Sequence, residues 1–185
     1  MPVNPGKYKV VLTLGRDLKD STEVVVNDDP YAPTPLSVRN AIRAANERME
    51  KSTAKLTALN DRLTEVDDIM KKVEAGYTSM DRKAADTIRK AAKVVADGLK
   101  EIREMLNGKP QLKQGYGNIP QETINGLVGE ARQLIMGKTT IPGEQENRLM
   151  GYAEEAVNNV IQKANALFEG SWKQYRALAE AAPLS

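Results

Sequence analysis

One long apolar repeat constrains the fold of this chain more than any other feature of its sequence. Between residues 38 and 73, apolar or small residues recur at alternating steps of four and three, with Ser52 as the single polar member. A mean step of 3.5 residues is typical of a helix that packs along its length against other helices. The repeat therefore predicts a helix over about 35–75, roughly 60 Å long at 1.5 Å per residue. Its members are Val38, Ile42, Ala45, Met49, Ser52, Leu56, Leu59, Leu63, Val66, Met70 and Val73.

The rest of the chain continues the helical pattern. A second seam predicts a helix over about 79–107, in which Gly98 indicates the close approach of a neighbour. A short helix is predicted over about 120–136, and a last one continues from Gly143 to about 181 with a bend at Gly170 and Ser171. We therefore expect a mainly α fold, an antiparallel up-down helical bundle of two very long helices, one long and one short, over 36–185. The second seam consists of Ala84, Ile88, Ala91, Val95, Gly98, Ile102 and Met105.

The first 29 residues predict a β-hairpin. Apolar residues alternate with mainly polar ones over 7–14 and again over 22–27, and Gly15 with the polar residues after it forms the connection. Because an isolated hairpin is marginal in water, we expect this one to pack on the bundle or to pair with a second copy. A proline-rich linker over 30–35 follows, with Thr34 as the helix N-cap and Pro35 as the first helical residue.

The composition excludes several functional classes. The formal net charge is only +2 and both signs are spread along the chain, so no electrostatic nucleic-acid binder is expected. The chain has no cysteine and no histidine, which excludes disulfides, thiolate metal sites and every histidine-containing catalytic triad. The sequence contains no run of 18 apolar residues, so we predict no membrane-spanning helix. No phosphate-loop motif is present either, and we expect no cofactor.

Paired carboxylates are the remaining candidates for catalysis. A glycosidase needs two carboxyl groups that face each other across a cleft, one of them with a raised pKa. The carboxylates of this chain occupy polar positions of amphipathic helices, beside lysines and arginines. We interpret them as a solvated surface and predict no catalytic and no metal-binding residue. The groups are Glu65 with Asp67 and Asp68, Glu101 with Glu104, and Glu154 with Glu155.

Aromatic residues offer candidate contacts for a carbohydrate or a partner. Trp172 lies near Phe168 and Tyr175 at helical spacing, and Tyr116 belongs to a glycine-rich loop. Stacked rings of this kind bind sugars when they are exposed. The helical spacing favours core packing for Trp172 and Tyr175, and the carbohydrate contact is the alternative.

Three segments together resemble a known family. The run from Pro5 to Leu12, with the later run from Glu23 to Pro30, resembles the last two strands of an immunoglobulin-like sandwich. The order of hairpin, long helix and final helical stretch is similar to the C-terminal end of bacterial sortilin-like BNR-repeat proteins, which are large secreted β-propeller proteins often labelled glycosyl hydrolases. The helical part of the resemblance is carried by Asn46, Asn60, Arg62 and Leu63, and by the stretch from Asn125–Leu127 to Trp172–Tyr175.

The resemblance implies a non-catalytic module of a larger, exported protein. The hairpin, residues 1–29, is then the remnant of an immunoglobulin-like sandwich, and the partners are the upstream domains of the same chain. The Asp-box pattern of the propeller occurs nowhere in this sequence, so no active residue can be carried over. An accessory, carbohydrate-contacting domain of a glycoside hydrolase is the first alternative and a protein-binding adaptor bundle the second. The hairpin edge is in addition a candidate homodimer interface.

Overall fold

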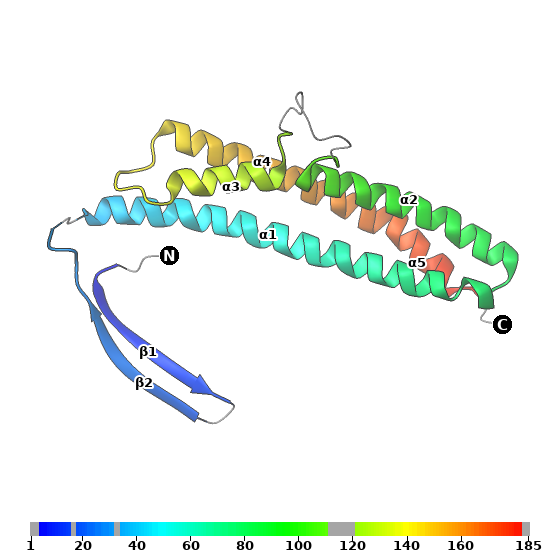
Figure 1. Ribbon diagram of the computed structural model, residues 1–185, viewed down its shortest axis with the longest axis horizontal. Helices are drawn as coiled ribbons and strands as arrows, with labels where there is room; N and C mark the ends of the chain where they lie inside the picture. The colour runs from blue at the N-terminus through cyan, green and yellow to red at the C-terminus, as the bar shows by residue number, and fades with distance from the viewer. Residues whose placement is uncertain (1–3, 16–17, 32–33, 111–120, 183–185) are drawn as a thin grey trace.

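The computed structural model describes residues 4–15, 18–31, 34–110 and 121–182, and it consists of a hairpin followed by a helical bundle (Figure 1). The strands are β1 (Gly6–Leu14) and β2 (Leu18–Val26). The helices are α1 (Leu36–Ala75), α2 (Arg82–Asn107), α3 (Ile124–Ile135), α4 (Glu144–Leu167) and α5 (Lys173–Glu180). A 3-10 turn, η1 (Tyr77–Ser79), precedes α2, and a π-helical turn, η2 (Phe168–Trp172), joins α4 to α5. The predicted mainly α fold with a hairpin in front is confirmed.

The helices form three rows (Figure 1). The first row is α1, which extends along the whole bundle. In the second row α2 and α3 follow each other in the same direction, and in the third row α4, η2 and α5 form one nearly continuous helix. Successive rows run in opposite directions, as the up-down prediction required. One half of α1 therefore lies beside α3 and α4, and the other half lies near α2 and α5.

The apolar repeat of α1 forms the first wall of the core. Its central members are buried, whereas Val38 and Ile42 at one end and Met70 and Val73 at the other are half-buried. The helix begins at Leu36, because Pro35 has an extended ψ of 142° and itself takes the N-cap position without a side-chain cap. The predicted Thr34 cap is therefore wrong by one residue. The buried members are Ala45, Met49, Ser52, Leu56, Leu59, Leu63 and Val66.

The predicted seam of α2 is correct at three of its seven positions. Three predicted members are buried, but Ala85, Leu99 and Leu106 are buried in place of the neighbouring Ala84, Gly98 and Met105. Both rows satisfy the four-three spacing. The row that contains two leucines removes more apolar surface from water, and this decides the rotation of the helix. The three correctly predicted members are Ile88, Val95 and Ile102.

Side-chain caps move two helix starts away from the predicted positions. The carboxylate of Asp81 accepts hydrogen bonds from the backbone N–H groups of Lys83 and Ala84, at 3.0 and 3.3 Å, so α2 begins after Asp81. The Thr123 hydroxyl accepts a hydrogen bond from the N–H of Gly126 at 3.0 Å, so α3 begins at Ile124 and not near residue 120. In both cases the cap satisfies backbone donors that would otherwise lack a partner.

The predicted close approach of a neighbour at Gly98 is confirmed by the packing of α2 against the third row. A Cβ atom built on Gly98 would lie 2.6 Å from Cδ1 of Leu167, so only glycine allows this helix approach without rearrangement. At the position of the predicted bend, Gly170 and Ser171 lie in the π-helical turn η2. The extra residue in such a turn rotates the side chains that follow it, and the buried Trp172 is the last residue of this turn.

The hairpin departs most from expectation. Its antiparallel register pairs Gly6 with Val26 and Leu14 with Leu18, so β2 starts earlier than predicted and includes Lys19 and Asp20. Nearly every residue on both faces is exposed, and β1 contacts β2 rather than the bundle. The expectation that the hairpin packs on the bundle is therefore wrong. The chain turns away from the bundle before α1, which leaves the strands projecting into solvent (Figure 1). Of the predicted linker, residues 32–33 lie outside the described part.

Candidate interaction site on the hairpin and at its base

One face of the hairpin is apolar and open to solvent. Strand alternation and the register place seven apolar side chains on this face, with Asp20 and Thr22 as its polar members. Leu12, Leu14 and Leu18 are 70%, 69% and 67% exposed. Contiguous apolar surface of this kind marks an interaction site more often than scattered apolar residues do. This surface, here named the apolar face, consists of Tyr8, Val10, Leu12, Leu14, Leu18, Val24 and Val26.

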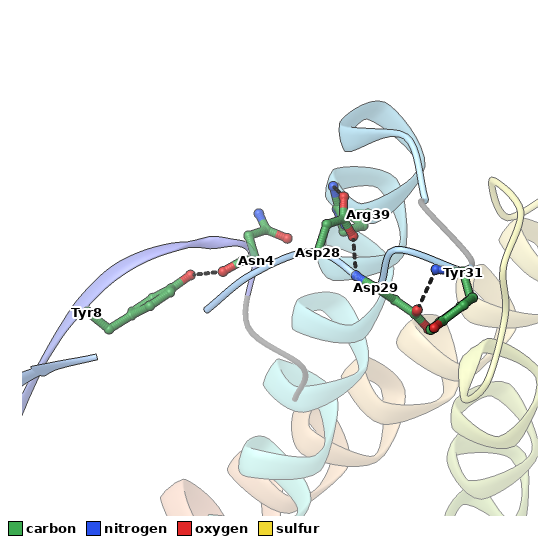
Figure 2. Close-up of polar contacts among 6 residues, drawn as sticks. All are labelled: Asn4, Tyr8, Asp28, Asp29, Tyr31 and Arg39. Carbon is green, nitrogen blue, oxygen red and sulfur yellow. Dashed lines mark hydrogen bonds and ion pairs between the residues drawn. The ribbon is translucent and has the colours of Figure 1, made fainter. Parts of the chain in front are cut away.

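A bidentate ion pair holds the base of the hairpin against the start of α1 (Figure 2). The Arg39 guanidinium donates to both carboxylate oxygens of Asp28, from Nη1 to Oδ1 at 2.5 Å and from Nη2 to Oδ2 at 2.9 Å. A planar guanidinium that meets a carboxylate through two parallel hydrogen bonds restricts direction as well as distance. The contact therefore restricts the angle at which the hairpin leaves the bundle. We name it the Asp28–Arg39 clamp.

Further hydrogen bonds support the clamp from both sides (Figure 2). The N–H of Tyr31 donates to Oδ1 of Asp29 at 2.9 Å, which stabilises the turn between β2 and α1. On the other side, the Tyr8 hydroxyl donates to the carbonyl oxygen of Asn4 at 2.6 Å. Asn4 in turn contacts Asn40 of α1 through a 3.4 Å side-chain hydrogen bond. Both chain segments that enter the hairpin are thus connected to the first turns of α1.

The clamp shifts the ionisation of both its members. The hydrogen bonds from Arg39 lower the pKa of the Asp28 carboxyl below its ordinary value, and those to Asp28 raise the pKa of Arg39. Each partner thus favours the charged form of the other. At neutral pH the clamp is an ionised pair, and it is half-exposed on the Asp28 side.

The predicted aromatic site lies in the core. Trp172 is 3% exposed and Tyr175 is fully buried, and their rings stack with centroids 5.5 Å apart. Burial is the main reason why the pKa of the Tyr175 hydroxyl is raised. Neither ring is accessible to a sugar, which corrects the alternative that placed them on the surface and agrees with core packing. Tyr116 lies outside the described residues.

The candidate carboxylates face basic side chains rather than each other. Glu154 accepts from Arg48 at 2.7 Å, and these hydrogen bonds are the main reason why the pKa of Glu154 is lowered. A general acid of a glycosidase needs the opposite shift. Among the described residues, no cluster of three or more carboxylates could hold a metal ion. The other candidates with a basic partner are Glu65, Asp67, Asp68, Glu101 and Glu104.

Sequence reasoning missed the clamp. Asp28 falls at the end of the predicted hairpin segment, and Arg39 belongs to a polar face of α1 with no unusual spacing. The pair is brought together by the turn between the strand and the helix, which no periodic pattern encodes. The available signal was an aspartate pair before a proline with an arginine one helical turn into α1, and that pattern is common on protein surfaces.

Comparisons with family models, with curated proteins and with solved structures found no match for this chain. The resemblance to BNR-repeat proteins therefore stays a prediction. No helix in the described part of the chain combines the length and the apolar character that a bilayer crossing needs.

Proposed function

We propose that this chain is a non-catalytic structural and interaction module of a larger exported protein of the BNR-repeat propeller type. Its hairpin docks by the apolar face on a sheet of the preceding domain, and its bundle extends from that joint. The observation that carries the proposal is an apolar hairpin face that is exposed to solvent, on a hairpin whose base is joined to α1 by a bidentate ion pair.

With two strands and an exposed apolar face, the hairpin resembles part of a larger sheet. A two-stranded hairpin is marginal in water by itself, and stability usually requires further strands or a packed face. Here the apolar face carries leucines that are about two-thirds exposed, whereas the opposite face is mixed and carries lysines, Ser21 and Glu23 together with the exposed Val11 and Val25. Sheets that pack face to face bury such apolar faces between layers about 10 Å apart. A second sheet is therefore the partner that this surface suits best.

The bundle supports a spacer role. The 40 residues of α1 span about 60 Å. The clamp lies at one end of this helix, so that a docked domain and the far end of the bundle would be separated by most of that length. The long core along α1 makes the spacer stiff, since each of its buried positions is held by neighbouring rows.

We propose a non-catalytic module because of the side chains that the chain carries. The sequence has no histidine or cysteine, and the best-placed carboxylate, Glu154, is held ionised by Arg48. The buried faces of the helices are lined mainly by aliphatic and aromatic residues, and the buried polar side chain among the described residues is Ser52. A bundle that hosts a site uses inward-facing polar ligands, and these faces do not supply them.

The test is to express the complete polypeptide encoded by the gene and to compare it with residues 1–185 alone. Amide exchange of residues 6–26 is expected to be slower in the complete polypeptide, because the apolar face is covered there. Leu12→Lys, on the apolar face, should abolish this protection. Val11→Lys, on the opposite face of the same strand and opposite the uncharged Ser21, is the matched control and should keep it. A reading frame without a further domain, or equal exchange in both proteins, would overturn the proposal.

A further inference from the structure

The hairpin has a second uncommitted surface, which is the free edge of β2. In Figure 1, β2 lies on the side of the hairpin that faces away from the bundle, so its edge is open to another molecule. Open edges present unpaired backbone N–H and C=O groups that can pair with another strand. This surface is distinct from the apolar face and can be occupied at the same time.

Two opposite charges lie on one face of this edge strand. Lys19 and Glu23 lie on the same face of β2, four residues apart, and both side chains are exposed. Neither forms an ion pair with any residue in the described ranges. Ser21 lies midway between them. The strand thus carries a charge pattern that becomes complementary to itself when its direction is reversed.

The reversed strand has one register in which these charges match. In an antiparallel pair of β2 strands centred on Ser21, Lys19 lies opposite Glu23 of the second copy, and the reciprocal pair forms by symmetry. Leu18 then lies opposite Val24 on the other face. Each directly opposed pair of this kind contributes to sheet stability.

The neighbouring registers are worse. A pair centred on Asp20 places the two Asp20 carboxylates opposite each other, which is unfavourable. A pair centred on Thr22 places Lys19 opposite Val25 and leaves both charges without a partner. All three registers keep the same side chains on each face, since the shift is by two residues, so the charges alone select between them.

We infer that this chain forms a two-fold dimer in which the β2 edges of two copies pair antiparallel about Ser21. The product is a four-stranded sheet with β1 strands at both outer edges. A two-fold axis perpendicular to the sheet keeps the two apolar faces on the same side, where they form one wider surface. The additional strands supply the stability that a lone hairpin lacks. The dimer does not depend on the proposed docking of that apolar face.

Disulfide trapping tests the geometry directly. Because the chain has no cysteine, a single introduced cysteine can bond only to its copy. Directly opposed residues of an antiparallel pair have Cα atoms about 4.5–5.5 Å apart, within the range that a disulfide spans. Ser21→Cys should therefore give a covalent dimer under mild oxidation. Thr13→Cys, exposed on the same face of β1, is the matched control and should stay mostly monomeric. Equal trapping of the two variants would overturn the inference.

Charge reversal tests the register. Lys19→Glu places glutamates opposite each other in its own dimer, and Glu23→Lys does the same with lysines, so each variant alone should dimerise roughly 2- to 30-fold more weakly in sedimentation equilibrium. A mixture of the two restores both opposite-charge pairs and should recover the dimer. Amide exchange of residues 6–26 verifies that the Glu23→Lys hairpin still forms, because Lys9 lies opposite position 23. A wild-type chain that stays monomeric, or a mixture that gains nothing, would refute the dimer.

Discussion

The close contact between Gly98 and Leu167 decides whether an alanine at position 98 stabilises or destabilises the bundle. Gly98→Ala adds a Cβ atom 2.6 Å from Cδ1 of Leu167, which is closer than such atoms can lie. The same change at Gly151 in α4 adds a Cβ with no atom within 4 Å. Both glycines lie inside helices, so both substitutions gain the same helix propensity. The difference between their effects on the free energy of unfolding therefore measures the packing cost at Gly98.

The magnitude follows from two opposed terms. Replacing glycine by alanine inside a helix stabilises it by about 0.5–1 kcal/mol. Forcing an extra methyl group into a packed contact costs about 1–3 kcal/mol. Gly151→Ala should therefore raise the free energy of unfolding by about 0.5–1 kcal/mol. Gly98→Ala should leave it unchanged or lower it by up to about 2.5 kcal/mol, because Leu167 must rotate away.

Urea unfolding followed by circular dichroism and by the fluorescence of the single, buried Trp172 measures both variants. A double-mutant cycle adds the mechanism. In a Leu167→Ala background the clash is absent, so Gly98→Ala should there stabilise as much as Gly151→Ala does. If Gly98→Ala stabilises the wild-type chain by the same amount as Gly151→Ala, the close helix approach is not a feature of the protein in solution.

Four further outcomes are expected. Leu59→Ala, which truncates a buried leucine, should lower the free energy of unfolding by about 2–5 kcal/mol in urea titrations, whereas the exposed Lys90→Ala should change it little. Deleting residues 1–29 should leave bundle stability nearly unchanged in the same assay, because the strands contribute no buried side chain to the core and the clamp is a partly exposed ion pair. In an NMR titration the pKa of Asp28 should lie below its ordinary value and return upward in Arg39→Gln; the clamp contributes above the ordinary pKa and is lost as the pH falls through the lowered one. The purified chain should not hydrolyse aryl glycosides; turnover abolished by Glu154→Gln would contradict this.

The helical part of the fold could be predicted because burial leaves a periodic trace. The seam of α1 is readable over ten turns, and each member repeats the same information, so single errors do not change the prediction. The rotation of α2 was less certain because Gly98 and Leu99 satisfy the same spacing. Side-chain volume decided between them, and volume enters only once the neighbouring rows are in place. The helix ends depend on single capping side chains such as those of Asp81 and Thr123, and the periodic apolar pattern does not indicate which residue is the cap.

The candidate site could be predicted only in part. The alternation of the two strands indicated an apolar face, but the same alternation is present whether the face is covered or exposed. Exposure depends on the direction in which the hairpin leaves the bundle, and the Asp28–Arg39 contact that restricts this direction is not encoded in the alternation. For Trp172 and Tyr175 the helical spacing indicated the core, and their burial agrees with it. Aromatic residues are conspicuous in a sequence, whereas an ion pair between two common charged residues is not.

The separation between the bundle and the hairpin has a physical consequence for binding. The core is made by helical residues and by Tyr77 of the turn η1, so the strands contribute no buried side chain to it. The hairpin can therefore gain, lose or exchange strand partners without a change in the bundle. Since the clamp already restricts the direction of the hairpin, a partner needs to order the two strands but not the whole module. When less conformational entropy is lost on binding, more of the interaction energy contributes to affinity. For this reason a surface of 18 strand residues can hold a partner in a defined position.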